Sequence, residues 1–372
     1  MKKLFTQIVL NDQNHLQQTK FLKNDFIFYC FMSKPLNKIE LPMSTGVWAL
    51  RWSPQTNKIV VGDCSGGVNL YDGKTFRQTT ELGGHVLGVL SAPIFPDINF
   101  CLTTSLDTKI RIWDLNQGSL CRTITGKHCD GMKAEIHPQG DRFALTRSNG
   151  KIDLISFSGT NTDLLVPPKK IEKTNEKKNE EEEEDEDEDE DEEEEEIVID
   201  QLHNENMAQT LNSKENVDIT SIAFSPNGTR LASGSRNGII TLYDLENYTI
   251  VKKFHAHSLN VCSLHFSSQD NLLLSGSEDM QVKIFDLEKT KEIHTISAHK
   301  SFVLSAKFNP QNQNVFASCS ADRNVKVFDR RTINCTHFWK EHKDQVWELD
   351  WNPDGSVIAS GSDDGTVCFF QI

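Results

Sequence analysis

Four sets of histidine, serine and aspartate are the residues of this chain whose types and spacing could do chemistry. They are His85, Ser105 and Asp107; His257, Ser277 and Asp279; His299, Ser320 and Asp322; and His342, Ser362 and Asp364. In each set the aspartate follows the serine by two residues and the histidine by 22 or 23. A serine hydrolase combines these three side chains as nucleophile, base and orienting carboxylate.

The recurrence of the set argues against catalysis. An active site occurs once, whereas this set returns at regular intervals, as a structural tie would. Histidines separated by a whole repeat are also too distant to share one metal ion. The chain has no phosphate loop of the form G-x-x-x-x-G-K-[ST]. We therefore predict no enzyme, no cofactor and no metal, and we expect the sets to satisfy buried groups in tight turns.

The sets belong to a repeat, and that repeat predicts the fold. Two clear copies are VDITSIAFSPNGTRLASGSRNGIITLYD, from residue 217, and VWELDWNPDGSVIASGSDDGTVCFFQ, from residue 346. The seven copies end at residues 72, 114, 156, 244, 286, 329 and 371. The copies share an alternating strand, a turn that often contains proline, a second strand, a tight turn of the Ser-x-Asp kind and a third strand rich in β-branched and aromatic residues. With a variable fourth strand, each copy describes one blade of a β-propeller.

The predicted architecture is therefore all-β, with seven blades in one ring. Residues 46–166 hold blades one to three, and residues 216–372 hold blades four to seven. Residues 167–215 are expected to form a disordered acidic insertion between blades three and four. Residues 1–45 are an N-terminal extension that supplies the strand closing the ring. Lys3–Leu10 is favoured for this strand over Asn37–Leu41, because His15 follows it as a histidine follows the fourth strand of other blades.

Composition narrows the class of partner. The net charge of −15 comes largely from an unbroken acidic run from Glu180 to Glu196, and without it the acids and bases nearly balance. The folded part is therefore not a basic nucleic-acid binder. The nine cysteines show no CxxC spacing, and no secretory signal is evident. These features favour a reducing intracellular compartment.

The repeats resemble the WD40 family. In that family the histidine, serine and aspartate form a hydrogen-bonded cluster with a tryptophan of the third strand, which Trp113 matches in blade two. Blades five, six and seven have Phe285, Phe328 and Phe370 at that position, so their clusters should lack the indole donor. In blades one, three and four the aspartate is replaced by Ser65, Asn149 and Asn237.

Apolar residues around the first strands predict a partner-binding face. Strand alternation places a valine-like residue in the core, and its two neighbours then face the surface that carries the Ser-x-Asp turns. The residue before each turn aspartate faces the same surface. The resulting set comes from blades six, seven, one and two: Trp48, Leu90, Leu106, Phe302, Leu304, Trp347 and Asp363. A tryptophan-bearing patch is typical of a docking site for a segment with an apolar anchor, with Asp363 or Glu348 near enough to receive a basic side chain. The open alternative is that these residues plug the channel or pack on one another.

The order of strings such as GHVLGVLS in blade two and FVLSAKFNP in blade six resembles the family of WD-repeat subunits of the superkiller complex. In animals that subunit also belongs to the RNA polymerase II-associated factor (Paf) complex. The resemblance implies a non-catalytic scaffold for exosome-dependent 3′-to-5′ mRNA decay, in cytoplasm and nucleus, with helicase and tetratricopeptide subunits as partners. It implies no direct contact with nucleic acid, membrane or a small-molecule substrate. The alternative is a substrate receptor of a cullin-type ubiquitin ligase or another generic adaptor.

Overall fold

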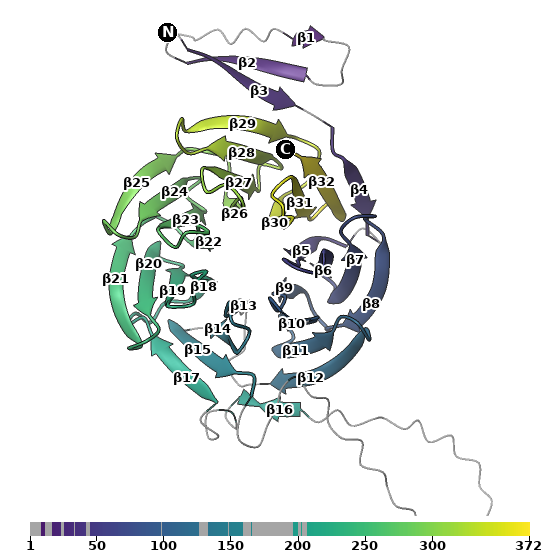
Figure 1. The fold of residues 1–372 in the computed structure, drawn as a ribbon, viewed down its shortest axis with the longest axis vertical. Helices are drawn as coiled ribbons and strands as arrows, with labels where there is room; N and C mark the ends of the chain where they lie inside the picture. The colour runs from purple at the N-terminus through teal and green to yellow at the C-terminus, as the bar shows by residue number, and fades with distance from the viewer. Residues whose placement is uncertain are drawn as a thin grey trace, which may run out of the picture.

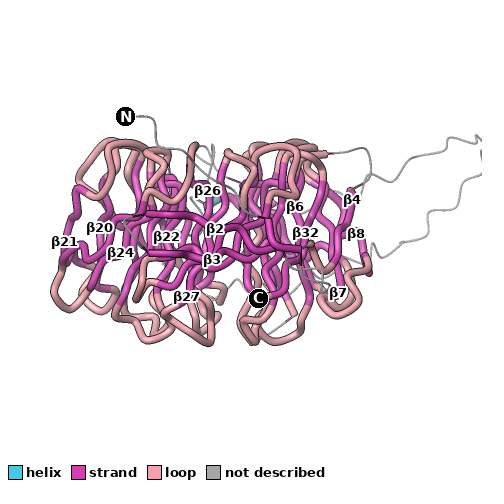
Figure 2. The backbone as a smooth tube through the Cα atoms, turned by 90° about the horizontal axis from the view of Figure 1, so that it is seen from above, coloured by secondary structure: helices cyan, strands magenta, loops and turns pink. Residues whose placement is uncertain are grey.

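The chain forms seven β-sheets arranged as a ring (Figure 1). The computed structural model describes residues 34–41, 45–97, 99–125, 133–147, 149–158, 165, 196–199, 202 and 207–372, and the backbone of 9–11, 17–23 and 26–32. Seen from the side, the strands run between two layers of loops (Figure 2). The predicted seven-bladed β-propeller is confirmed.

Each blade has four antiparallel strands, ordered from the centre of the ring outward. The first three blades are β5 (Val47–Trp52), β6 (Lys58–Asp63), β7 (Gly67–Asp72) and β8 (Gln78–Gly84); β9 (Val89–Ser91), β10 (Phe100–Ser105), β11 (Lys109–Asp114) and β12 (Ser119–Thr125); and β13 (Ala134–Ile136), β14 (Arg142–Thr146), β15 (Lys151–Ser156) and β17 (Ala208–Asn212).

The remaining four blades keep the same order. They are β18 (Ile219–Phe224), β19 (Arg230–Ser235), β20 (Ile239–Asp244) and β21 (Thr249–His255); β22 (Val261–Phe266), β23 (Leu272–Ser277), β24 (Val282–Asp286) and β25 (Lys291–Ile296); β26 (Val303–Phe308), β27 (Val315–Ser320), β28 (Val325–Asp329) and β29 (Asn334–Trp339); and β30 (Val346–Trp351), β31 (Val357–Ser362), β32 (Thr366–Gln371) and β4 (Asn37–Glu40).

Blades pack face to face, and a valine–glycine contact fixes the approach at four seams. The first strand of most blades begins with a fully buried valine, such as Val47. It packs against a glycine in the second strand of the neighbouring blade, as Val47 does on Gly361. A Cβ atom on that glycine would lie 2.3 Å from Val47 Cγ1, which is closer than side chains can approach. The glycines Gly62, Gly234 and Gly276 make the same contact elsewhere, so any larger residue there would push two blades apart.

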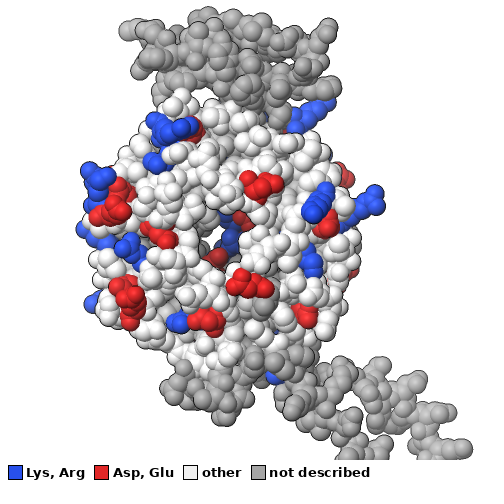
Figure 3. All heavy atoms as spheres, in the orientation of Figure 1, with Lys and Arg blue, Asp and Glu red and all other residues white. Residues whose placement is uncertain are grey.

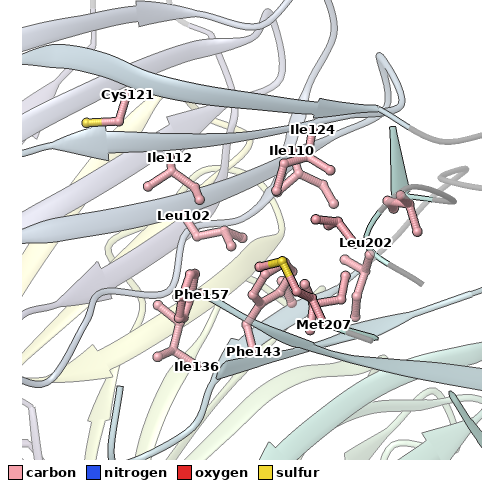
Figure 4. Packing of buried hydrophobic residues seen from close by; sticks show 14 of the residues in the cluster. Leu102, Ile110, Ile112, Cys121, Ile124, Ile136, Phe143, Phe157, Leu202 and Met207 are labelled. Carbon is pink, nitrogen blue, oxygen red and sulfur yellow. The ribbon is translucent and has the colours of Figure 1, made fainter. Parts of the chain in front are cut away.

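The hydrophobic core is divided among the seams. Seven clusters of buried apolar side chains each combine residues from two adjacent blades. Figure 4 shows the cluster between blades two and three. A blade cannot bury both its faces alone, so the ring is held by burial between blades rather than within them.

The strand that closes the ring differs from the one we favoured. Asn37–Glu40 (β4) pairs antiparallel with β32 and completes blade seven, so the preference for Lys3–Leu10 was wrong. Leu36 and Leu41 extend the pairing through backbone hydrogen bonds to Phe369 and Gly365. The segment next to blade one needs only a short connection to reach this position. Val9–Asn11 (β1) instead pairs with β2 (Gln17–Lys23), while residues 3–8 lie outside the described residues.

The N-terminal extension also reaches blade six. β2 pairs with β3 (Phe26–Met32), and β3 pairs in parallel with β29 where Phe31 faces His337. The sheet of blade six therefore has seven strands. The repeat pattern had offered no account of residues 17–38.

The insertion ends earlier than we predicted, and it falls inside blade three. Residues 167–195, with most of the acidic run, lie outside the described residues. Beyond them, Glu196–Val198 (β16) adds a parallel strand to β12 of blade two. Ile199, Leu202 and Met207 are buried in the cluster of Figure 4. β17 then pairs with β15 as the fourth strand of blade three, so the boundary at residue 215 was wrong. Apolar residues after the acidic run explain the difference, because they give this segment a core to join.

Candidate partner-binding surface

The first strand of six blades contains a β-bulge close to its start. The ladder to the second strand skips one residue there, so that residue has no partner across the sheet. The skipped residues are Trp48, Leu90, Thr220, Cys262, Leu304 and Trp347. A bulge bends the strand and re-aims the unpaired side chain. Four of the seven residues predicted for the partner-binding face occupy this position.

The other three predicted residues lie beside these bulges. The residue before each turn aspartate donates its backbone N–H to the carbonyl of the residue before the first strand. Leu106 pairs in this way with Gly88, Ala321 with Phe302, and Asp363 with Gln345, each at 3.0 Å. The same bond occurs in every blade except blade three, where Gly131 and Ser148 lie outside the described residues. The structure thus brings the predicted residues to one face of the ring.

The two tryptophans form the centre of this set. The rings of Trp48 and Trp347 lie 6.1 Å apart, centroid to centroid, at an interplanar angle of 54°. Both side chains are half-buried, so they pack on each other and still present surface to solvent. The mutual packing that we left open as the alternative is therefore present, and the docking site stays a prediction.

The apolar side chains of the predicted face, Trp48, Trp347, Leu90, Leu106, Phe302 and Leu304, come from blades six, seven, one and two. We call the surface that they form the apolar sector. Phe302 is 42% and Leu106 41% exposed, whereas Leu90 and Leu304 are half-buried. Two exposed residues escaped the sequence prediction, Val86 at 77% and Leu87 at 50%. They follow His85 in the loop before blade two, and that position in the repeat would have identified them.

Blades three to five supply none of the residues predicted for the partner-binding face, yet blade five also has exposed apolar side chains. Leu259 occupies in blade five the position that Leu87 has in blade two, and it is 47% exposed. Met280, in the β23–β24 turn, is 43% exposed. These two residues stand apart from the tryptophan pair, so Leu259 is a matched control for the apolar sector.

The two carboxylates expected to receive a basic side chain are already engaged. Asp363 accepts the indole N–H of Trp48 at 2.9 Å and the side-chain amide of Gln345 at 2.8 Å. Glu348 lies in the channel wall, where it accepts the Ser305 hydroxyl at 2.9 Å and pairs with Lys307 at 3.1 Å. Asp363 thus orients a tryptophan, and Glu348 belongs to the channel.

The channel is lined by charges of both signs (Figure 3). Arg51 of β5 pairs with Glu135 of β13 at 2.6 Å, and Lys307 also reaches Asp350 at 3.2 Å. Burial raises the pKa of Glu135, although Arg51 opposes the shift. Burial likewise lowers the pKa of Lys133. A cavity of about 340 Å³ opens between these groups. Their ion pairs connect blade one with blade three and blade six with blade seven, and Lys133 of blade three lies 4.0 Å from Glu348 of blade seven.

In four blades the histidine and the aspartate of each set form a compact hydrogen-bonded cluster with a hydroxyl group, which we call a tie. His85 Nδ1 lies 2.9 Å from an oxygen of Asp107, and its Nε2 lies 2.8 Å from the Thr103 hydroxyl. The Trp113 indole donates to the same hydroxyl at 2.8 Å. The ties of blades five to seven join His257 to Asp279 and Ser275, His299 to Asp322 and Ser318, and His342 to Asp364 and Ser360.

The serine that we assigned to these ties was wrong. The hydroxyl bonded to histidine lies two residues earlier, inside the second strand. Ser105 instead donates to the Leu87 carbonyl at 2.7 Å and accepts the Asp107 N–H at 3.1 Å. Ser277, Ser320 and Ser362 do the same in their blades. Residues two apart on a strand face the same side, so spacing alone could not distinguish Thr103 from Ser105.

The blades without a complete set use other turn contacts. In blade one the two polar positions are exchanged: Asp63 stands where other blades have serine, and it accepts the backbone N–H groups of Ser65 and Gly67, both at 2.9 Å. In blade four the Ser235 hydroxyl bonds Asn237 at 2.6 Å. Asn149 of blade three has a φ of 91°, unlike the residue at that position in the other blades. What the turns share is a left-handed residue directly after this position, such as Gly66, Thr108 and Gly238.

Geometry and burial oppose a catalytic role for the ties. The hydroxyls that face histidine, those of Thr103, Ser275, Ser318 and Ser360, belong to residues that are fully buried, so no substrate reaches them. Burial lowers the pKa of His85 to about 4, although Asp107 opposes the shift. Backbone N–H groups of Lys109 and Val86 lower the pKa of Asp107 despite its burial. At neutral pH the tie therefore joins a neutral imidazole to a carboxylate.

Other chemistry is also unsupported by the residues that the structure describes. No three histidine, cysteine or acidic side chains among them are grouped as a metal site would require. Seven cysteines are free thiols in that part of the chain. It contains no helix with the length and apolarity of a membrane span.

Two models of WD40 protein families match segments of this chain. The family model of the WD domain, G-beta repeat, matches residues 76–114, 290–329 and 333–371. The model of the anaphase-promoting complex subunit 4 WD40 domain matches residues 191–269. The first region ends at Asp114 and the last at Gln371, where our repeats end.

Several curated proteins are similar to this chain. WD repeat-containing protein VIP3 of Arabidopsis thaliana is 26% identical over 238 residues, which are 61% of this chain and 62% of that protein. WD repeat-containing protein SL1-17 of Schistosoma mansoni is 25% identical over 211 residues, 55% of each chain. Pre-mRNA-processing factor 19 homolog 2 of Arabidopsis thaliana is 22% identical over 230 residues, 61% of this chain and 35% of that protein. The matched region thus spans less than two thirds of each relative.

Proposed function

Because this chain is a seven-bladed β-propeller of WD40 repeats, we propose that it is a non-catalytic scaffold that binds other proteins through its apolar sector. The observation that carries the proposal is the half-buried Trp48–Trp347 pair, with Phe302 and Leu106 exposed on the same face. Aromatic side chains in such a position bury a large area at little entropic cost when a partner covers them.

The repeated polar sets support the same proposal. Their hydroxyl groups are buried and each histidine is held between two partners, so these side chains stabilise turns. The rigid ring then presents the loops of one face at fixed positions. Rigid presentation lowers the entropic cost of binding, which is the physical advantage of a scaffold.

We further propose that the scaffold belongs to the superkiller complex and supports exosome-dependent 3′-to-5′ mRNA decay. Support comes from the resemblance of the strings in blades two, six and seven to the WD-repeat subunits of that complex. The partners would be its helicase and tetratricopeptide subunits. A nuclear role in the Paf transcription elongation complex, and a location in both cytoplasm and nucleus, belong to this same proposal.

Affinity purification of the full chain from its native cells tests the proposal. We expect helicase and tetratricopeptide subunits of the superkiller complex in amounts comparable to the bait. Recovery of a cullin adaptor in their place would overturn the decay proposal and identify the chain as a substrate receptor of a ubiquitin ligase. Recovery of the Paf subunits from nuclear extract would support the nuclear role, and their absence there would contradict it.

A further inference from the structure

Trp48 and Trp347 differ in the hydrogen bonding of their indole N–H groups. Trp48 donates to Asp363 at 2.9 Å. The indole nitrogen of Trp347 is buried and has no hydrogen-bond partner among the described residues. Two similar rings, 6.1 Å apart, are therefore in different hydrogen-bonding states.

Trp48 is held from several sides. Asp363 is itself fixed by the Gln345 amide at 2.8 Å. Gly88 lies directly against the indole, so that a Cβ atom there would be 2.4 Å from a ring carbon of Trp48. Gly46 packs on Asp363 in the same way, with a hypothetical Cβ 2.6 Å from its Oδ1. The bond and these close contacts keep one orientation for the Trp48 ring.

Trp347 has no comparable restraint on its nitrogen. Both tryptophans are skipped by the ladder of their own blade, so the two residues differ in the hydrogen bonding of the indole and not in their backbone pairing. A buried N–H without an acceptor is unfavourable, because the group has lost water and gained nothing. The ring is half-buried, so part of it already borders solvent. An arriving acceptor would therefore favour a different orientation of this ring.

We propose that Trp347 turns when a partner docks and donates its indole N–H to a carbonyl oxygen of the docked segment, while Trp48 stays fixed as an apolar platform. This inference rests on the proposed docking function. The occupant is an extended segment of a partner protein with an apolar side chain and a neighbouring free carbonyl. A neutral carbonyl suits the site better than a carboxylate or phosphate, because the carboxylate of Asp363 lies beside the tryptophan pair and would repel an anion.

The free protein provides the first test. Trp347→Phe removes the unsatisfied donor and keeps an aromatic ring, so we expect Tm to stay the same or rise. Trp48→Phe removes a made hydrogen bond and leaves Asp363 with one donor fewer, so we expect Tm to fall. A fall for Trp347→Phe equal to that for Trp48→Phe would show that the Trp347 N–H is already satisfied and would overturn the inference.

Binding provides the second test, with the purified tetratricopeptide subunit of the superkiller complex as probe. We expect Trp347→Phe to weaken the affinity about tenfold, which corresponds to ~1.4 kcal/mol. The control Leu259→Ser should leave it unchanged. In the 15N-labelled chain, the indole N–H resonance of Trp347 should move further on binding than that of Trp48, whose N–H keeps its hydrogen bond to Asp363.

The outcomes separate the two proposals. If the subunit binds but Trp347→Phe binds equally well and its resonance does not move, the inference about Trp347 is wrong and the scaffold proposal stands. If the subunit fails to bind the unmodified chain, the proposed partner is wrong, and the unfolding comparison alone decides the state of the Trp347 N–H.

Discussion

Asp363, in the turn between β31 and β32, accepts the indole N–H of Trp48 from β5 at 2.9 Å. A carboxylate of blade seven thus orients an aromatic ring of blade one, across the seam where β4 closes the propeller. The same hydrogen bond therefore connects the first and last blades and fixes one tryptophan of the apolar sector.

A double-mutant cycle measures this contact. Trp48→Phe and Asp363→Ala should each destabilise the fold, and the pair should be less destabilising than the sum, with a coupling free energy of about 1 kcal/mol. Urea unfolding of the four proteins gives the value. Strict additivity would show that the hydrogen bond contributes nothing to stability.

The tie of blade two predicts which hydroxyl group contributes more to the free energy of unfolding. Thr103→Val keeps the shape of the side chain but leaves both His85 and Trp113 without their shared partner, so we expect a loss of about 2 kcal/mol in the free energy of unfolding. Ser105→Ala removes only turn contacts and should cost about 1 kcal/mol. Denaturant titration of the two variants decides the order. A larger loss for Ser105→Ala would restore our original assignment.

The same ties predict the response to acid. Burial lowers the pKa of His85 to about 4 in the folded chain, and it also lowers the pKa values of His257 and His299. Between pH ~6.5 and ~4 the unfolded chain therefore binds protons that the folded chain does not. Stability should fall as pH falls through this window, by up to ~1.4 kcal/mol per pH unit for each such histidine.

Thermal unfolding between pH 8 and 4 checks this slope. The variant His85→Asn should have lower stability at neutral pH and a shallower decline below pH ~6.5, because one of the titrating groups is gone. A slope that is identical in the variant and the parent would show that His85 does not contribute.

A strained turn offers a stabilising substitution. Ile333, between β28 and β29, has a φ of 55°, a left-handed conformation that β-branched residues disfavour, and it is 42% exposed. Ile333→Gly should raise the free energy of unfolding by about 0.5–1 kcal/mol. The control Val251→Gly, at a 49% exposed position within β21, should lower it by a similar amount. A loss at both positions would mean that Ile333 makes a contact that offsets its strain.

Much of this fold was predictable because the residue pattern of each repeat predicts the first three strands of its blade. Glycines such as Gly361 and valines such as Val47 recur at fixed positions because the seams require them. What the pattern could not supply were the segments outside the repeat. Asn37–Leu41 was the less favoured of two candidates for the closing strand, and three-dimensional pairing was needed to choose it. Ala208–Asn212 is separated from its blade by the insertion, so the repeat pattern did not identify it.

The shared face of the predicted residues could be predicted from the sequence, but their contacts could not. Alternation along the first strand placed Trp48 and Trp347 on one face, as the structure does. The bulge that leaves both residues unpaired has no signature in residue types, and the bond from Trp48 to Asp363 joins residues 315 positions apart. Asp363 was therefore taken for a partner contact, although its carboxylate holds Trp48.

The most direct test of the scaffold account is the affinity of the chain for the purified tetratricopeptide subunit when both tryptophans are removed. We expect Trp48→Ala with Trp347→Ala to weaken binding by more than tenfold, above ~1.4 kcal/mol, while circular dichroism still reports a folded β-protein. The control Leu259→Ser should bind as the parent does. An unchanged affinity in the folded double variant would show that this sector is not where partners dock.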